Sequence, residues 1–231
     1  MSIDAGIQVG VVYPQIELNG DPEAVRSLAD AVEAQGYRHL VAYDHVLGAD
    51  HANREPELTG PYDEDDPFHD PFVLFAYLAG RSETLEFASG ILILPQRQTA
   101  LVAKQAADLA VLSGDRFSMG VGVGWNPVEY DALGEDFSTR GRRADEQIGL
   151  LRRYWSERTV SFAGRFDRVD RAGILPRPLQ PVPVWIGGFG DASLRRAVAL
   201  GDGFIFGGPR IGVQRSWERL KDLLHEAGRP L

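Results

Sequence analysis

The sequence contains no cysteine, which excludes disulfides, thiolate nucleophiles and zinc–sulfur sites. It has no surplus of basic residues either: 24 Lys and Arg stand against 33 Asp and Glu, a net charge of −9, which argues against nucleic acid as a partner. No apolar run approaches the roughly 18 residues of a membrane span, and the first ten residues lack the pattern of a secretory leader. We therefore expect a soluble, cytoplasmic protein that binds neither membrane nor nucleic acid.

A recognisable metal site is also missing. The acidic stretch "YDEDDPFHD" at 62–70 contains residue types that metals prefer, but its spacing matches no known ligand set. We interpret it as part of a solvated loop and expect no metal.

Apolar runs alternate with amphipathic segments along the whole chain, which is typical of βα units around a parallel sheet. With 231 residues, 44% of them hydrophobic, the chain suits a single domain over 1–231. The predicted strands cover 7–14, 39–45, 85–95, 116–125, 182–188 and 203–208, with a hairpin at 160–169. The predicted helices cover 21–36, 70–82, 99–114, 142–157, 191–201 and 213–228.

Six βα units in a row fit either a doubly wound sheet or a TIM (β/α)₈-type barrel. The first turn, "YPQIELNGDP", has no G-x-G-x-x-G pattern, so it lacks the dinucleotide signature of the doubly wound fold. The sequence therefore favours the barrel. A full barrel has eight units, so we expect an incomplete barrel in which the last two units are missing.

Candidate catalytic residues lie at the carboxyl ends of the predicted strands, where barrel enzymes place their sites. Asp44 and His45 follow the second strand. His45 can act as a general acid or base near neutral pH, and Asp44 can orient it. The alternative is structural: Asp44 caps a turn and His45 packs under the next loop.

Glycines at four of the six strand ends would let a flat ligand lie against bare backbone. The segment "GGFGDAS" at 187–193 leads into a helix, whose free N–H groups favour an anion such as phosphate. Ser193 and Arg210, which follows Gly208, are candidate additional contacts. The alternatives are that Asp191 simply caps the helix and that Arg210 is a solvated surface residue. Trp125 could line the site of a ring-shaped ligand or belong to the core.

Several strings together resemble the bacterial luciferase-like oxidoreductases, and most closely the branch that uses the deazaflavin coenzyme F-420. They are "ASGILILPQRQTALVAKQAADLAVLSGDRFSMGVGVGW", "EYDALGEDFSTRGRRADEQIGLLRRYWSE", "VSFAGRF", "PRPLQPVPVWIGG" and "LRRAVALGDGF". The resemblance runs from about residue 7 to 208.

The resemblance implies a barrel that holds the cofactor ring at its carboxyl mouth, with His45 as acid or base and Asp44 beside it. It places a non-proline cis peptide behind the ring at Gly90–Ile91. The remaining implied cofactor contacts are Gly122, Gly124, Trp125 and Asn126 at the ring face and Gly187 and Gly188 at the phosphate.

Three functions remain open. The first is hydride transfer between coenzyme F-420 and a small organic substrate. The second is FMN-dependent monooxygenation with dioxygen and a separate flavin reductase. The third is a non-catalytic shortened barrel or a fragment. An incomplete barrel leaves two strand edges to be covered, so we also expect a homodimer.

Overall fold

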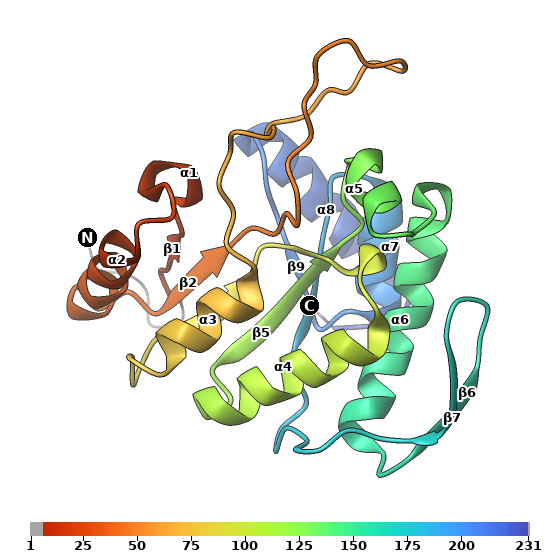
Figure 1. The fold of residues 1–231 in the computed structure, drawn as a ribbon. Coiled ribbons are helices and arrows are strands. Elements are labelled where there is room, and N and C mark those ends of the chain that lie inside the picture. Colours follow the sequence, from red (N-terminus) through yellow and green to blue (C-terminus); the bar gives the residue numbers. More distant parts are fainter. Residues whose placement is uncertain (1–6, 231) are drawn as a thin grey trace.

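A parallel sheet forms the centre of residues 7–230, the part of the chain that the computed structural model describes (Figure 1). Its six main strands follow one another in chain order, and every neighbouring pair is parallel. They are β1 (Val11–Val12), β2 (His39–Ala42), β3 (Glu86–Ser89), β5 (Phe117–Gly122), β8 (Val184–Gly187) and β9 (Gly203–Ile205). The sheet is an open half-barrel with β1 and β9 at its edges, as expected for a barrel with six units.

Helices connect the strands and cover the outside of the sheet (Figure 1). The main ones are α2 (Pro22–Ala34), α3 (Pro71–Ala79), α4 (Thr99–Ser113), α6 (Arg140–Ser156), α7 (Asp191–Leu200) and α8 (Arg210–Glu226). All six were predicted from the sequence. The short helices α1 (Gln15–Leu18) and α5 (Pro127–Ala132) and the 3₁₀ turns η1 (Leu94–Gln96) and η2 (Phe137–Thr139) were not.

Helices α2 and α3 begin at aspartate caps, and α4 ends at a glycine. Asp21 accepts a hydrogen bond from the Glu23 N–H at the start of α2, and Asp70 accepts one from the Phe72 N–H at the start of α3, both at 2.9 Å. Gly114 ends α4 with a φ of +69°, a conformation that favours glycine. These local signals explain why those three boundaries could be predicted from the sequence.

The core lies between the sheet and its covering helices. Phe75 of α3 packs on Phe87 of β3 and Phe117 of β5, with ring centroids 5.3 and 6.2 Å apart. All three side chains are buried, and each contributes about 1.5–3 kcal/mol to stability. This packing anchors the middle strands whose carboxyl ends carry the candidate site.

Outside the sheet, β6 (Val160–Ala163) and β7 (Arg168–Ala172) form the expected antiparallel hairpin. Its turn covers residues 164–167, where the Gly164 N–H donates to the carbonyl of Asp167. Over residues 7–230, no helix combines the length and apolarity that a bilayer crossing needs. The same residues contain no group of three His, Asp or Glu side chains arranged to hold a metal ion.

Candidate functional site

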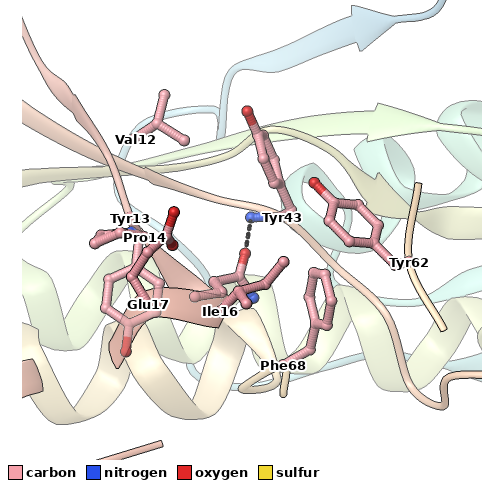
Figure 2. Close-up of a pocket in the computed structure, with 9 residues that line it drawn as sticks. Val12, Tyr13, Pro14, Ile16, Glu17, Tyr43, Tyr62 and Phe68 are labelled. Atoms are coloured by element: carbon pink, nitrogen blue, oxygen red, sulfur yellow. Dashed lines mark hydrogen bonds between the residues drawn. The ribbon is translucent and has the colours of Figure 1, made fainter. Parts of the chain in front are cut away.

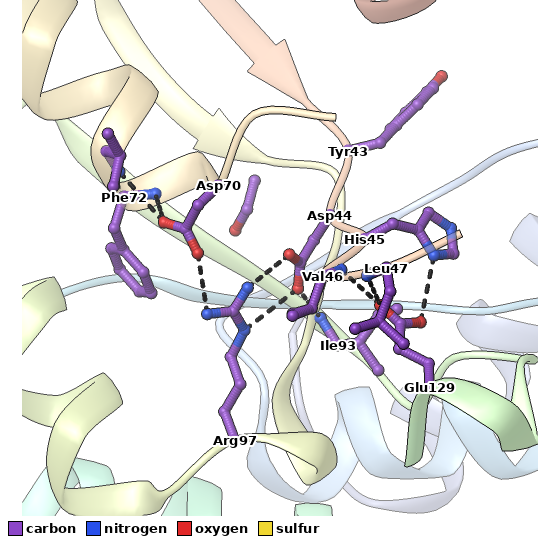
Figure 3. A network of polar contacts seen from close by, with 12 residues as sticks. Tyr43, Asp44, His45, Val46, Leu47, Asp70, Phe72, Ile93, Arg97 and Glu129 are labelled. Atoms are coloured by element: carbon purple, nitrogen blue, oxygen red, sulfur yellow. Dashed lines mark hydrogen bonds and ion pairs between the residues drawn. The ribbon is translucent and has the colours of Figure 1, made fainter. Parts of the chain in front are cut away.

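The ring of His45 sits just beyond β2 against a buried carboxylate. Its Nδ1 lies 3.2 Å from Oε2 of Glu129, which comes from α5 (Figure 3). Three aromatic rings surround the imidazole, with centroids 4.9 Å (Phe68), 5.4 Å (Tyr62) and 5.8 Å (Trp125) away. The His45 side chain is 8% exposed, so it lies in an enclosed site and not on an open surface.

Asp44 does not contact the imidazole, so the expected Asp44–His45 pairing is wrong. Its Oδ1 forms an ion pair with Arg97 at 2.6 Å, and its Oδ2 accepts a hydrogen bond from the Ile93 N–H at 2.8 Å (Figure 3). Arg97 also pairs with Asp70 at 3.0 Å. Asp44 therefore ties the end of β2 to the segment after β4 (Leu92–Ile93) and to the start of α3.

Burial acts on both partners of this network. It raises the pKa of the Asp44 carboxyl, although the charge of Arg97 and the hydrogen bond from Ile93 oppose that shift. Burial lowers the pKa of the Arg97 guanidinium, but the ion pairs with Asp44 and Asp70 outweigh burial and raise it. Because both carboxylate oxygens of Asp44 already have partners in Arg97 and Ile93, we assign Asp44 a structural role. Its predicted catalytic role has no geometric support.

Glu129 is the residue that sequence reasoning missed. It is fully buried, and its second oxygen, Oε1, accepts hydrogen bonds from the backbone N–H groups of Val46 and Leu47. Burial raises the pKa of the Glu129 carboxyl, but the hydrogen bonds from His45 and Val46 outweigh burial and hold it below its usual value. Glu129 is therefore ionised at neutral pH.

A signal for Glu129 was present in "NPVE" at 126–129. Asn followed by Pro and, three residues after the Asn, by Glu is typical of a helix start. Asn126 is indeed the N-cap of α5 and accepts a hydrogen bond from the Val128 N–H at 3.0 Å. The Asn126 side chain is buried, and it acts as the helix cap that fixes the position of Glu129.

The third strand is interrupted at the predicted point: the Gly90–Ile91 peptide is cis, and it separates β3 from β4. The side chain of Ile91 occupies the space beside Gly122 and Gly187, where a Cβ would clash with it. Ile93 fills the space beside Gly124 in the same way. An isoleucine side chain therefore fills the Cβ side of Gly122, Gly124 and Gly187, and the contact of these glycines with a ligand stays a prediction.

The predicted anion corner is assembled from two neighbouring strand ends. The ring of Phe189 lies beside Gly207 and Gly208, which brings the turn after β8 against the turn after β9. Helices α7 and α8 both begin there without a side-chain cap. The corner therefore brings together two helix starts without side-chain caps, and its binding of an anion stays a prediction.

The side chains predicted at this corner differ in how well they suit an anion. Asp191 is the first residue of α7 and not its N-cap, and its carboxylate is held by Arg195 and Arg219 at 2.6 and 2.9 Å. Ser193 donates its hydroxyl proton to the carbonyl of Gly190 and is not free to donate it to a phosphate. Arg210 begins α8 and is exposed, close to Gly208.

A cavity of about 240 Å³ opens at the ends of β1 and β2 (Figure 2). The aromatic rings of Tyr43, Tyr62 and Phe68 line it, and Tyr62 and Phe68 are the rings that also enclose His45. The one charged side chain in the described lining is Glu17 of α1. The remaining lining residues are Val12, Tyr13, Pro14, Gln15 and Ile16. Tyr62 and Phe68 thus lie beside both the cavity and the imidazole of His45.

Comparison with known proteins identifies the scaffold. The family model "Luciferase-like monooxygenase" matches residues 3–231. The chain belongs to the luciferase-like monooxygenase family. This luciferase-like chain is 37% identical over 207 residues to an uncharacterised protein of Mycobacterium tuberculosis, a match covering 87% of this chain and 72% of the relative.

Some relatives with named activities depend on F420, and others depend on FMNH(2). The "F420-dependent glucose-6-phosphate dehydrogenase" of Nakamurella multipartita is 26% identical, over 91% of this chain and 60% of its own length. The "FMNH(2)-dependent dimethylsulfone monooxygenase" of Pseudomonas fluorescens is 29% identical, over 87% of this chain and 53% of its own length. The chain therefore spans little more than half of these two relatives.

Solved structures agree with the fold. The monooxygenase RslO1 of Streptomyces bottropensis matches with a TM-score of 0.81 at 22% identity, over 97% of this chain and 68% of its own. An F420-dependent secondary alcohol dehydrogenase matches with a TM-score of 0.79 at 19% identity, over 97% and 66% of the two chains. The luciferase-like chain is thus an oxidoreductase of a family whose members use a flavin or a deazaflavin.

Proposed function

We propose that this luciferase-like protein transfers a hydride between the deazaflavin coenzyme F-420 and a small organic substrate, with His45 as the acid or base. The observation that carries the proposal is the enclosed imidazole, held 3.2 Å from Glu129 beside the cavity at the mouth of the sheet. A positioned proton donor or acceptor suits hydride exchange at an alcohol or ketone, because a proton must move whenever the hydride does.

The described residues suit such a cofactor at two places. The corner formed by the starts of α7 and α8, with Gly188, Gly208 and Arg210, fits a phosphate-bearing tail. Ile91, packed over Gly122 and Gly187, presents an apolar surface for a flat ring. When bound, the deazaflavin supplies the hydride acceptor or donor. His45 then takes the hydroxyl proton of an alcohol or returns one to a ketone.

We further propose that the substrate is largely apolar and carries no phosphate. The cavity is lined by Tyr43, Tyr62 and Phe68, and its described lining contains Glu17 but no Lys or Arg. A phosphorylated sugar would meet a carboxylate with no compensating cation, which is unfavourable.

The decisive experiment is a fluorescence titration of the purified chain with coenzyme F-420 and, separately, with FMN. We expect tight binding of the deazaflavin alone. The His45→Ala variant should bind the deazaflavin as tightly as the wild type does, yet lose turnover by about 10²–10⁴-fold with any substrate that the wild type converts. Full activity in this variant would contradict the role of His45.

The second candidate function is FMN-dependent monooxygenation, favoured by the similarity to the FMNH(2)-dependent relative. It requires a flavin reductase as partner. Tight binding of FMN alone would support it, and binding of neither cofactor by folded protein would contradict both functions.

The substrate class is tested by a panel of uncharged alcohols and ketones run beside glucose 6-phosphate, following the deazaflavin absorbance. We expect turnover only within the uncharged set. A Glu17→Gln variant should leave activity on uncharged substrates within a few-fold of the wild type. Efficient oxidation of glucose 6-phosphate by the wild type would contradict the proposed class.

A further inference from the structure

We propose that Glu129 is the positioning residue for His45: its carboxylate holds the imidazole in the tautomer protonated at Nδ1, which leaves Nε2 free to exchange a proton with the substrate. The inference rests on the proposed function, in which His45 is the acid or base. It concerns a residue 84 positions away in the chain, on a helix of six residues.

The two carboxylate oxygens of Glu129 hold different parts of the same segment. Oε2 faces Nδ1 of His45 at 3.2 Å. Oε1 accepts from the backbone N–H of Val46 and, at 3.3 Å, from that of Leu47. Because Glu129 is fully buried, water does not compete for these contacts. One side chain therefore positions both the ring and the backbone that follows it.

The charge around the ring specifies the tautomer. An ionised carboxylate can only accept hydrogen bonds, so the nitrogen that faces Glu129 must carry the proton. The other groups facing the imidazole are Tyr62 and Phe68 from the loop after β2, and Trp125 from the end of β5. Asp44, the neighbouring charge in sequence, is paired with Arg97. Among the described residues, Glu129 is thus the group that decides which nitrogen is protonated.

The same contact favours the charged form of the ring when a proton arrives. A carboxylate at Nδ1 stabilises the imidazolium that forms when Nε2 accepts a substrate proton. The Glu129→Gln substitution keeps size and shape but replaces one acceptor by an amide N–H₂ donor. If the amide oxygen keeps its bond to the Val46 N–H, the N–H₂ group faces Nδ1 and selects the opposite tautomer.

The test reads the tautomer directly, from the ¹⁵N chemical shifts of the histidine ring nitrogens in the full chain at neutral pH. The chain has five histidines, and the His45→Gln variant assigns the signals of His45 by their loss. We expect an Nδ1–H tautomer in the wild type and an Nε2–H tautomer in Glu129→Gln. Glu157→Gln is the matched control, because it makes the same chemical change at a solvent-accessible ion pair with Arg153, at the C-terminal end of α6, and should leave the signals unchanged.

The kinetic arm separates this inference from the proposed function. With the first substrate that the wild type converts, Glu129→Gln should lower kcat by about 10²-fold and leave the affinity for coenzyme F-420 within a few-fold. If His45→Ala is inactive but Glu129→Gln keeps wild-type kcat and tautomer, the positioning role is wrong and the proposed function stands. If the Glu129→Gln variant does not fold, an Nε2–H tautomer in the wild type would still overturn the inference.

Discussion

At the scale of single residues, Asp44 and His45 are chain neighbours with separate partners. Successive side chains of an extended segment point in opposite directions. Asp44 therefore reaches Arg97 under the start of α3, whereas His45 reaches Glu129 of α5 (Figure 3). The adjacency in sequence indicated that this strand end matters, but it suggested the wrong acid–base pair.

This separation predicts different consequences for the two carboxylates. Asp44→Asn leaves the partly buried guanidinium of Arg97 with Asp70 as its remaining ion-pair partner, so we expect a loss of about 1.5–3 kcal/mol of unfolding free energy. The tautomer of His45 should not change. Asp30→Asn, which removes the exposed pair with Arg81, is the control and should cost less than about 1 kcal/mol. Urea unfolding of both variants measures the difference, and equal losses would contradict the structural part assigned to Asp44.

At the scale of elements, the site depends on pieces that are too short for periodicity to reveal. Helix α5 has six residues, and its Asn126 cap sets the position of Glu129. The loop between β2 and α3 contains no helix or strand, as expected, yet it delivers Tyr62 and Phe68 to His45. The long helices were predicted because each carries several turns of apolar pattern, whereas α1 and α5 carry one or two turns.

The interruption of the third strand belongs to the same scale. Gly90 within an apolar run indicated an irregular strand, and the resemblance to luciferase-like proteins placed the cis peptide at Gly90–Ile91, where the structure has it. Neither signal indicated that the Ile91 side chain would cover Gly122 and Gly187. That contact joins the third strand to β5 and β8. It therefore depends on the register in which the strands pair and not on any one segment.

At the scale of the whole molecule, the expected homodimer stays a prediction. Helices α3 and α4 pack against each other, and both expose large apolar side chains, among them Val73 (67% exposed), Leu101 (51%) and Leu112 (76%). Exposed apolar side chains on adjoining helices are typical of an interface. We expect a second copy of the chain to cover them.

Light scattering after gel filtration tests this prediction. The wild type should have the mass of a dimer, and the double variant Val73→Lys, Leu101→Lys should have that of a monomer with unchanged circular dichroism. Both positions are exposed, so the substitutions should cost little stability in the monomer. A monomeric wild type at micromolar concentration would contradict the expectation.

The sequence by itself determined the six βα units, the main helix boundaries and the position of His45 at a strand end. These properties follow from local periodicity, from caps such as Asp21 and Asp70, and from the rule that parallel strands gather their carboxyl ends at one edge. Only the tertiary structure decided that Glu129 is the partner of His45, that Arg97 neutralises Asp44, and that aromatic rings from the loop after β2 wall the cavity. Those contacts join residues tens of positions apart, and their geometry arises only when the sheet and its loops pack together.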